Sequence, residues 1–179
     1  MTKHILIGVV GIALQASLGV ANAQQAEAPK SNPLDVIPDK MPFNIPYGAP
    51  ISLARAQAAI SAAVTEAEKR GWTLNVAVVD SGGNLVAFGR MDGAQLASIS
   101  ISEHKARVAV TFRRPTRVLE DAVQKSDYKY VLSLDGVIAS RGGIPLIEDG
   151  KLIGAIGCSG GSGSQDEAAC MVGAATINK

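Results

Sequence analysis

His104 is the only histidine after His4, and imidazole is the side chain here best suited to ligate a metal near neutral pH. The stripe that it shares, at helical spacings of three or four, is otherwise apolar: Ala97, Ile101, Val108 and Phe112. We therefore expect His104 to face a pocket or the core. It is either a metal ligand or a hydrogen-bonded interior or interface histidine.

Several charged side chains stand where predicted strands end or predicted helices begin: Arg90, Asp92, Lys105, Arg141 and Asp166. A shared cleft would gather polar groups at such positions. Arg90 or Arg141 could pair with a carboxylate ligand, and Lys105 or Asp166 could move a proton if burial shifted its pKa. The alternative interpretation is a set of caps and surface ion pairs, and Asp92 is well explained as a helix cap.

A glycine-rich loop over residues 159–164 precedes the last predicted helix. Free N–H groups at Gly160 and Gly161, with the positive end of the helix dipole, could hold a carboxylate or phosphate. The loop lacks both the Gly-Lys-Ser/Thr ending of a P-loop and a G-x-G-x-x-G motif in a βαβ context, so it predicts no nucleotide site. We favour a tight turn whose small residues serve packing.

Cys158 and Cys170 are the two cysteines of the chain. One ends a predicted strand and the other lies in a predicted helix that packs back on it, so either a disulfide or two buried free thiols is consistent with the sequence. We favour the free thiols. With no catalytic nucleophile signature and a single histidine after His4, the sequence predicts no His-rich metal site.

The hydrophobic pattern predicts the elements that must position these residues. Helices are expected over 52–70, 92–112 and 117–125, and in a last segment that begins near Gln165. Two capping boxes are expected, Asp92 with Gln95 and Ser164 with Glu167. Strands are expected over 73–79, 85–90, 137–140, 144–147 and 151–158, with Asp149-Gly150 forming a tight hairpin turn. Hairpins indicate an antiparallel sheet, covered by apolar helices.

The N-terminal region has the order of a cleaved signal peptide over residues 1–23. Lys3 is followed by an apolar run from Ile5 to Val20 and by the A-x-A site Ala21-Asn22-Ala23. The run is too short and too diluted for a membrane span. Residues 24–50 read as a proline-rich extended arm, a tether or a strap docked on a neighbouring surface. Residues 51–179 then form one domain, and we expect a periplasmic or secreted protein without a membrane span after cleavage.

The whole chain has 17 Lys and Arg against 16 Asp and Glu, so the mature form without Lys3 is neutral. This balance gives no electrostatic case for nucleic acid or an anionic membrane as partner. Only three Phe, three Tyr and one Trp are present, few for a pocket that buries a whole porphyrin.

Three groups of motifs resemble the GlcG/HbpS-like family, which includes the C-terminal domain of PduO-type proteins. The first is Val76-Ala77-Val78-Val79-Asp80-Ser81-Gly82-Gly83-Asn84-Leu85-Val86-Ala87-Phe88 with Arg90-Met91-Asp92-Gly93-Ala94. The second is Lys105-Ala106, Phe112 and Arg114-Pro115-Thr116. The third is Gly142-Gly143-Ile144-Pro145-Leu146, Asp149-Gly150, Ile153-Gly154-Ala155-Ile156-Gly157, Ser159-Gly160 and Gln165-Asp166-Glu167. The resemblance spans roughly residues 51–177.

The resemblance implies an α+β fold: a profilin-like, five-stranded antiparallel sheet flanked by helices, assembling into homo-oligomers. It also implies binding or handling of heme and iron. From the residues themselves, His104 is the leading candidate for the iron ligand, although the family's motif does not require histidine at this position, and Lys105, Arg113 or Arg114 could pair with the propionates. Gly143, from the third group of motifs, is a further candidate ligand-binding residue. The alternative is an enzyme or sensor for a small carboxylate or carbonyl metabolite, using Arg90, Lys105 and the Gly160-Gly161 loop.

Overall fold

The computed structural model describes residue 34 and residues 36–178, so the predicted signal peptide and the start of the arm lie outside the described residues. Residues Lys40–Lys179 form one compact unit. Its elements follow one another as α1 (Leu53–Lys69), β1 (Asn75–Asp80), β2 (Leu85–Arg90), α2 (Ala97–Thr111), α3 (Thr116–Ser126), the 3-10 helix η2 (Lys129–Ser133), β3 (Gly143–Glu148), β4 (Lys151–Ser159) and α4 (Gly163–Ala174).

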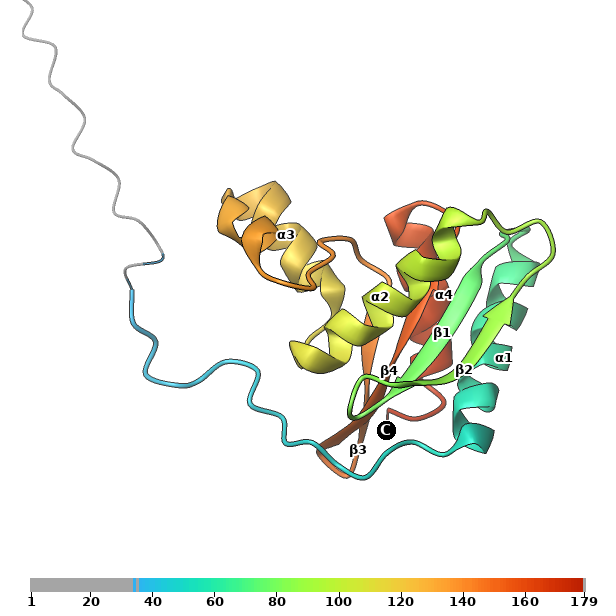
Figure 1. Cartoon of the computed structure of the whole chain (residues 1–179), viewed down its shortest axis with the longest axis horizontal. Coiled ribbons are helices and arrows are strands. Elements are labelled where there is room, and N and C mark those ends of the chain that lie inside the picture. Colours follow the sequence, from blue (N-terminus) through green and yellow to red (C-terminus); the bar gives the residue numbers. More distant parts are fainter. Residues whose placement is uncertain (1–33, 35, 179) are drawn as a thin grey trace, which may run out of the picture. The chain divides into compact units, whose positions relative to one another are not determined.

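The strands form a four-stranded antiparallel sheet in the order β2-β1-β4-β3, which confirms the predicted α+β class. Helices α1 and α4 pack on one face and α2 lies across the other (Figure 1). Strand β1 serves both faces because its side chains alternate. Val76 and Val78 join the core under α1 and α4, while Ala77 and Val79 pack beneath α2.

The α2 backbone lies unusually close to the sheet. A Cβ atom at Gly157 would meet the Ser102 carbonyl oxygen and the Ala106 nitrogen, and one at Gly143 would meet the Lys105 carbonyl oxygen. These two glycines therefore have no room for a side chain. Their absence of side chains lets the middle of α2 sit directly over the ends of β3 and β4.

Local predictions succeeded at the hairpins and at the starts of α1 and α3, and failed at the two capping boxes. Asp149 and Gly150 have φ of 49° and 71°, as a tight primed turn requires, and β3 and β4 pair across them. Both predicted capping boxes are wrong. Helix α2 begins only at Ala97, with no side-chain cap, and the box of α4 is formed by Ser162 and Gln165.

Residues 137–140 were predicted as a strand and are irregular instead. This stretch packs its apolar side chains against a small cluster between α2, α3 and η2, away from the sheet. Burial in that cluster accounts for its apolar character, and no ladder of hydrogen bonds with a neighbouring strand is involved. An apolar run of this length does not distinguish the two situations.

The described end of the arm is docked on the domain. Tyr47 makes a single parallel bridge to Leu152, and its hydroxyl donates to the Val110 or Thr111 carbonyl oxygen, each at 3.2 Å. A fifth strand, which the family resemblance implies, is not among the described residues. In its place the arm contributes this single bridge to Leu152, near the start of β4, where β3 also pairs. No described helix is both long and apolar enough to cross a membrane.

Candidate functional site

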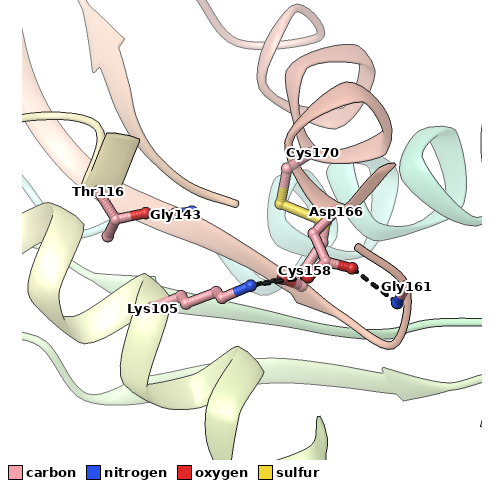
Figure 2. The surroundings of a disulfide bond; sticks show 7 residues. All are labelled: Lys105, Thr116, Gly143, Cys158, Gly161, Asp166 and Cys170. Atoms are coloured by element: carbon pink, nitrogen blue, oxygen red, sulfur yellow. Dashed lines mark hydrogen bonds and ion pairs between the residues drawn. A yellow bond between two sulfur atoms is a disulfide. The ribbon is translucent and has the colours of Figure 1, made fainter. Parts of the chain in front are cut away.

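A buried ion pair connects α2 to the start of α4. The Lys105 Nζ atom lies 2.7 Å from Asp166 Oδ2 and also donates to the Cys158 carbonyl oxygen at 3.2 Å (Figure 2). The two side chains are 1% and 3% exposed. Lys105 faces the sheet because it continues the buried helical stripe of Ser98 and Ser102.

The glycine-rich loop holds the other carboxylate oxygen of Asp166. The Gly161 N–H donates to Oδ1 at 2.9 Å, as Figure 2 shows, and Gly160 contributes a further backbone contact. Burial raises the pKa of Asp166, while the Lys105 ammonium and these N–H groups act in the opposite direction. The loop N–H groups therefore hold a carboxylate, which was the less favoured interpretation of the sequence, and this carboxylate belongs to the protein's own Asp166.

This arrangement bears on the small-carboxylate alternative. The Lys105 ammonium and the Gly161 N–H already have a charged partner in Asp166, so an external acid would have to displace a buried side chain. Gly143 lies against Lys105, since a Cβ atom at Gly143 would meet the Lys105 carbonyl oxygen, and its own N–H donates to the Thr116 Oγ1 atom at 2.9 Å. Lys105, Asp166 and the Gly160-Gly161 loop thus satisfy one another in a polar centre, and Gly143 lies beside it.

Arg141 lies beside this centre and is also neutralised internally. Its Nε atom donates to Glu120 Oε1 at 2.6 Å, and its backbone N–H donates to Glu120 Oε2 at 2.7 Å. Its guanidinium also lies 3.5 Å from Asp121 and 3.7 Å from Glu167. Burial would raise the pKa of Glu120, but the bonds from Arg141 outweigh it and the pKa is lowered. Arg141 thus ties the loop before β3 to α3.

His104 projects from the flank of α2 toward the segment between η2 and β3. Its Nε2 atom lies 2.8 Å from the Gly136 carbonyl oxygen. A carbonyl oxygen only accepts, so Nε2 carries the proton and a neutral ring has its lone pair on Nδ1. None of the described residues bonds to Nδ1, and the ring is partly exposed.

Arg90 and Arg113 lie apart from the polar centre. Arg90 is exposed and lines an open depression of about 460 Å³ with Val64, Glu68 and Asp92 at the edge of β2. Arg113 donates to the Ile45 carbonyl oxygen at 3.4 Å, and its guanidinium carbon lies 5.8 Å from the Tyr47 ring centroid. The candidate residues therefore occupy several places. Those in or beside the polar centre are Lys105, Arg141, Gly143, Gly160, Gly161 and Asp166.

A disulfide joins Cys158 to Cys170, so the favoured interpretation as free thiols is wrong. The bond connects the end of β4 to α4, and the Cys158 carbonyl oxygen is the one that accepts from Lys105 (Figure 2). With both sulfurs in this bond, neither is available to a metal. The described residues contain no cluster of three or more His, Cys, Asp or Glu side chains that could hold a metal ion.

Sequence reasoning missed Glu120 as a member of this region. Its only sequence signal is a place on the predicted helix over 117–125, next to Asp121, which reads as an ordinary acidic helix face. Thr116 belonged to a quoted motif but had no assigned role. Its bond to the Gly143 N–H depends on packing between segments 27 positions apart, which no local pattern reports.

Comparison with known proteins matches residues 51–175 to the family model "Haem degrading protein HbpS-like". The protein GlcG of Escherichia coli is 38% identical over 109 residues, covering 61% of this chain and 81% of its own. A double mutant of Streptomyces reticuli HbpS superposes with a TM-score of 0.68 and 30% identity, over 80% of this chain and 97% of that one. The chain belongs to the HbpS-like family.

A further solved relative is described as a PduOC:heme complex. It superposes with a TM-score of 0.65 and 32% identity, over 73% of this chain and 96% of that chain. The sequence-based assignment to the family is thereby confirmed. Both the family description and this complex name heme, in proteins that share the fold of residues 51–175.

Proposed function

We propose that the mature form, residues 24–179, is an exported heme-binding protein in which His104 would hold the iron, working as a homo-oligomer of profilin-like architecture. The observation that carries the proposal is family membership together with a heme complex of a relative 32% identical. Bound heme would supply an iron atom whose reactivity depends on its axial ligand and on the polarity around it.

The hydrogen bond of His104 leaves one ring nitrogen, Nδ1, with a lone pair that can bind a metal. Histidines that ligate metals commonly donate their second ring N–H to a carbonyl or carboxylate, which fixes the tautomer and the ring orientation. The Gly136 carbonyl oxygen plays that part for Nε2 and leaves the Nδ1 lone pair for iron. The side of α2 that faces the sheet is closed to a ligand, because Ser102 and Lys105 on that side are buried. A heme could therefore reach α2 only from the partly exposed flank that carries His104.

The ion pairs within the protein limit which basic side chains could bind the heme propionates. Lys105 is unsuited, because its ammonium is buried against Asp166. Arg113 has no carboxylate partner among the described residues and keeps a partly exposed guanidinium, so we assign it this role. Export is supported by the disulfide, since such bonds persist in oxidising compartments and are rare in the cytosol.

A hemin titration of the mature protein, followed by absorbance, tests the proposal. We expect a saturable Soret shift that His104→Ala removes. His104→Gln is the sharper variant, because its amide can still donate to the Gly136 carbonyl oxygen but is a poor iron ligand. Ser100→Ala, an exposed change on the same helix, serves as the control. Unchanged heme spectra in His104→Gln would refute the ligand assignment, and a lack of saturable binding in the unmodified protein would refute the function.

A further inference from the structure

A second, separate cavity lies between the end of α2, helix α3 and η2. Its volume is about 330 Å³, at the small end of the range for ligand sites. The walls are mainly apolar and aromatic: Phe112, Val118, Leu119, Ala122, Tyr128 and Val131. Part of this wall is the small hydrophobic cluster of the fold, so the cavity is built from packed elements.

Arg114 is the one charged residue among those lining this cavity. Its Nε atom donates to the Phe112 carbonyl oxygen at 2.9 Å, and its guanidinium carbon lies 3.6 Å from the Phe43 ring centroid. These two contacts fix the plane of the guanidinium. No described residue accepts from its two terminal nitrogens, and no described carboxylate pairs with it. Burial lowers the pKa of Arg114, and Arg113 adds to this effect while Tyr130 opposes it.

A partly buried arginine without an anion is an unsatisfied arrangement, because desolvating a charge costs free energy that a counter-charge offsets. The pair of free terminal nitrogens matches a carboxylate, which accepts two parallel hydrogen bonds from arginine. Tyr130 and Leu134 at the rim are 50% and 39% exposed, so apolar surface remains there for a ligand to cover.

We propose that this cavity binds a small monocarboxylate with an apolar or aromatic body, the carboxylate paired with Arg114 and the body enclosed by Phe112, Tyr128 and Tyr130. A single cation in an apolar cavity favours one negative charge on the ligand. Arg114 was one candidate for the heme propionates, but the residues assigned to heme above are His104 and Arg113, and this site uses neither of them, so the proposal does not rest on heme binding.

The test is a titration of the full ¹⁵N-labelled chain with 3-phenylpropionate and, separately, with its neutral amide, followed by ¹H–¹⁵N chemical shifts. We expect saturable shifts concentrated at residues 112–134, with the acid binding about tenfold or more tightly than the amide, as a charge-assisted pair implies. Arg114→Gln should abolish that preference. Arg114→Lys, which keeps the charge but loses the fork, should reduce it.

Lys129→Gln is the matched control, since it removes one positive charge from η2 at a side chain 76% exposed and outside the cavity lining. It should leave the preference for the acid unchanged. Equal affinity for acid and amide in the unmodified protein would overturn the proposal without recourse to any variant. So would an acid preference that survives Arg114→Gln, shifts located elsewhere, or no saturable shift at millimolar acid.

Discussion

Removing one partner of the Lys105–Asp166 pair tests whether the polar centre holds the fold together. Lys105→Met keeps an unbranched apolar stem but leaves the Asp166 carboxylate, 3% exposed, without a cation. Breaking a buried pair on one side costs about 3–5 kcal/mol, because an uncompensated charge stays in the interior. We expect that loss in the free energy of unfolding.

The double variant separates the pair from its surroundings. Asp166→Leu alone leaves the Lys105 ammonium buried and unpaired, so it should lose a similar amount. Lys105→Met with Asp166→Leu removes both charges, and its loss should fall below the sum of the single losses by about 2 kcal/mol or more. The Gly161 N–H and the Cys158 carbonyl oxygen lose their partners, so full recovery is not expected.

The assay is urea unfolding of the mature protein with the disulfide intact, followed by circular dichroism and by Trp72 fluorescence. Coincident transitions by the two probes would support a two-state analysis. Strictly additive losses would refute the reasoning, since they would mean that Lys105 and Asp166 do not stabilise each other. A Lys105→Met variant with an unchanged free energy of unfolding would refute the reasoning equally.

Three further outcomes follow from the same geometry. In Lys105→Met we expect the raised pKa of Asp166 to rise further, so the folded state binds the proton more tightly than the unfolded state. The loss of stability should therefore be smaller at pH 5 than at pH 8. A larger loss at pH 5 would contradict this. Replacing both cysteines with alanine should cost about 3 kcal/mol in urea unfolding, the loop-closure value for a separation of 12 residues, and no change would argue against that loop-closure contribution. Gly143→Ala should lower the melting temperature far more than Gly71→Ala. The new Cβ atom at position 143 meets the Lys105 backbone, whereas the one at position 71 lies in open space and brings only the strain of a φ of 69°. Equal effects would exclude close packing of α2 as the cause.

Elements with strong local patterns could be predicted from the sequence. The repeat of alanine over residues 52–70 corresponds to α1, whose buried side is Ala56, Ala59, Ala63 and Ala67. The Asp149-Gly150 turn needs only two residues with positive φ, a preference that belongs to the residues themselves. The starts of α2 and α4 were less predictable, since several Ser, Asp and Gln residues near each of them can cap, and packing selects among them.

The candidate residues could be picked out from the sequence by their chemistry, but the residues with which they pair could not. Lys105, Arg141 and Asp166 were identified as a polar group from their places at element ends, and two interpretations stayed open: a cleft for an external ligand, or a set of caps and surface ion pairs. In the fold Asp166 is paired with Lys105, 61 positions away, and Arg141 with Glu120, 21 positions away. Periodicity and turn chemistry report neighbours within a few residues and carry no information about such pairs.

Most helices, the hairpins, the family and a short set of residues able to do chemistry could be predicted from local patterns in the sequence. Which of those residues are already paired within the protein depends on long-range packing. Gly143 and Gly157 let α2 approach the sheet so closely that Lys105 is enclosed against Asp166, whereas His104, one position earlier, stays on the partly exposed flank with a free lone pair. Neighbouring side chains on a helix point in directions about 100° apart, and the packing of α2 on the sheet sets which of these directions is buried.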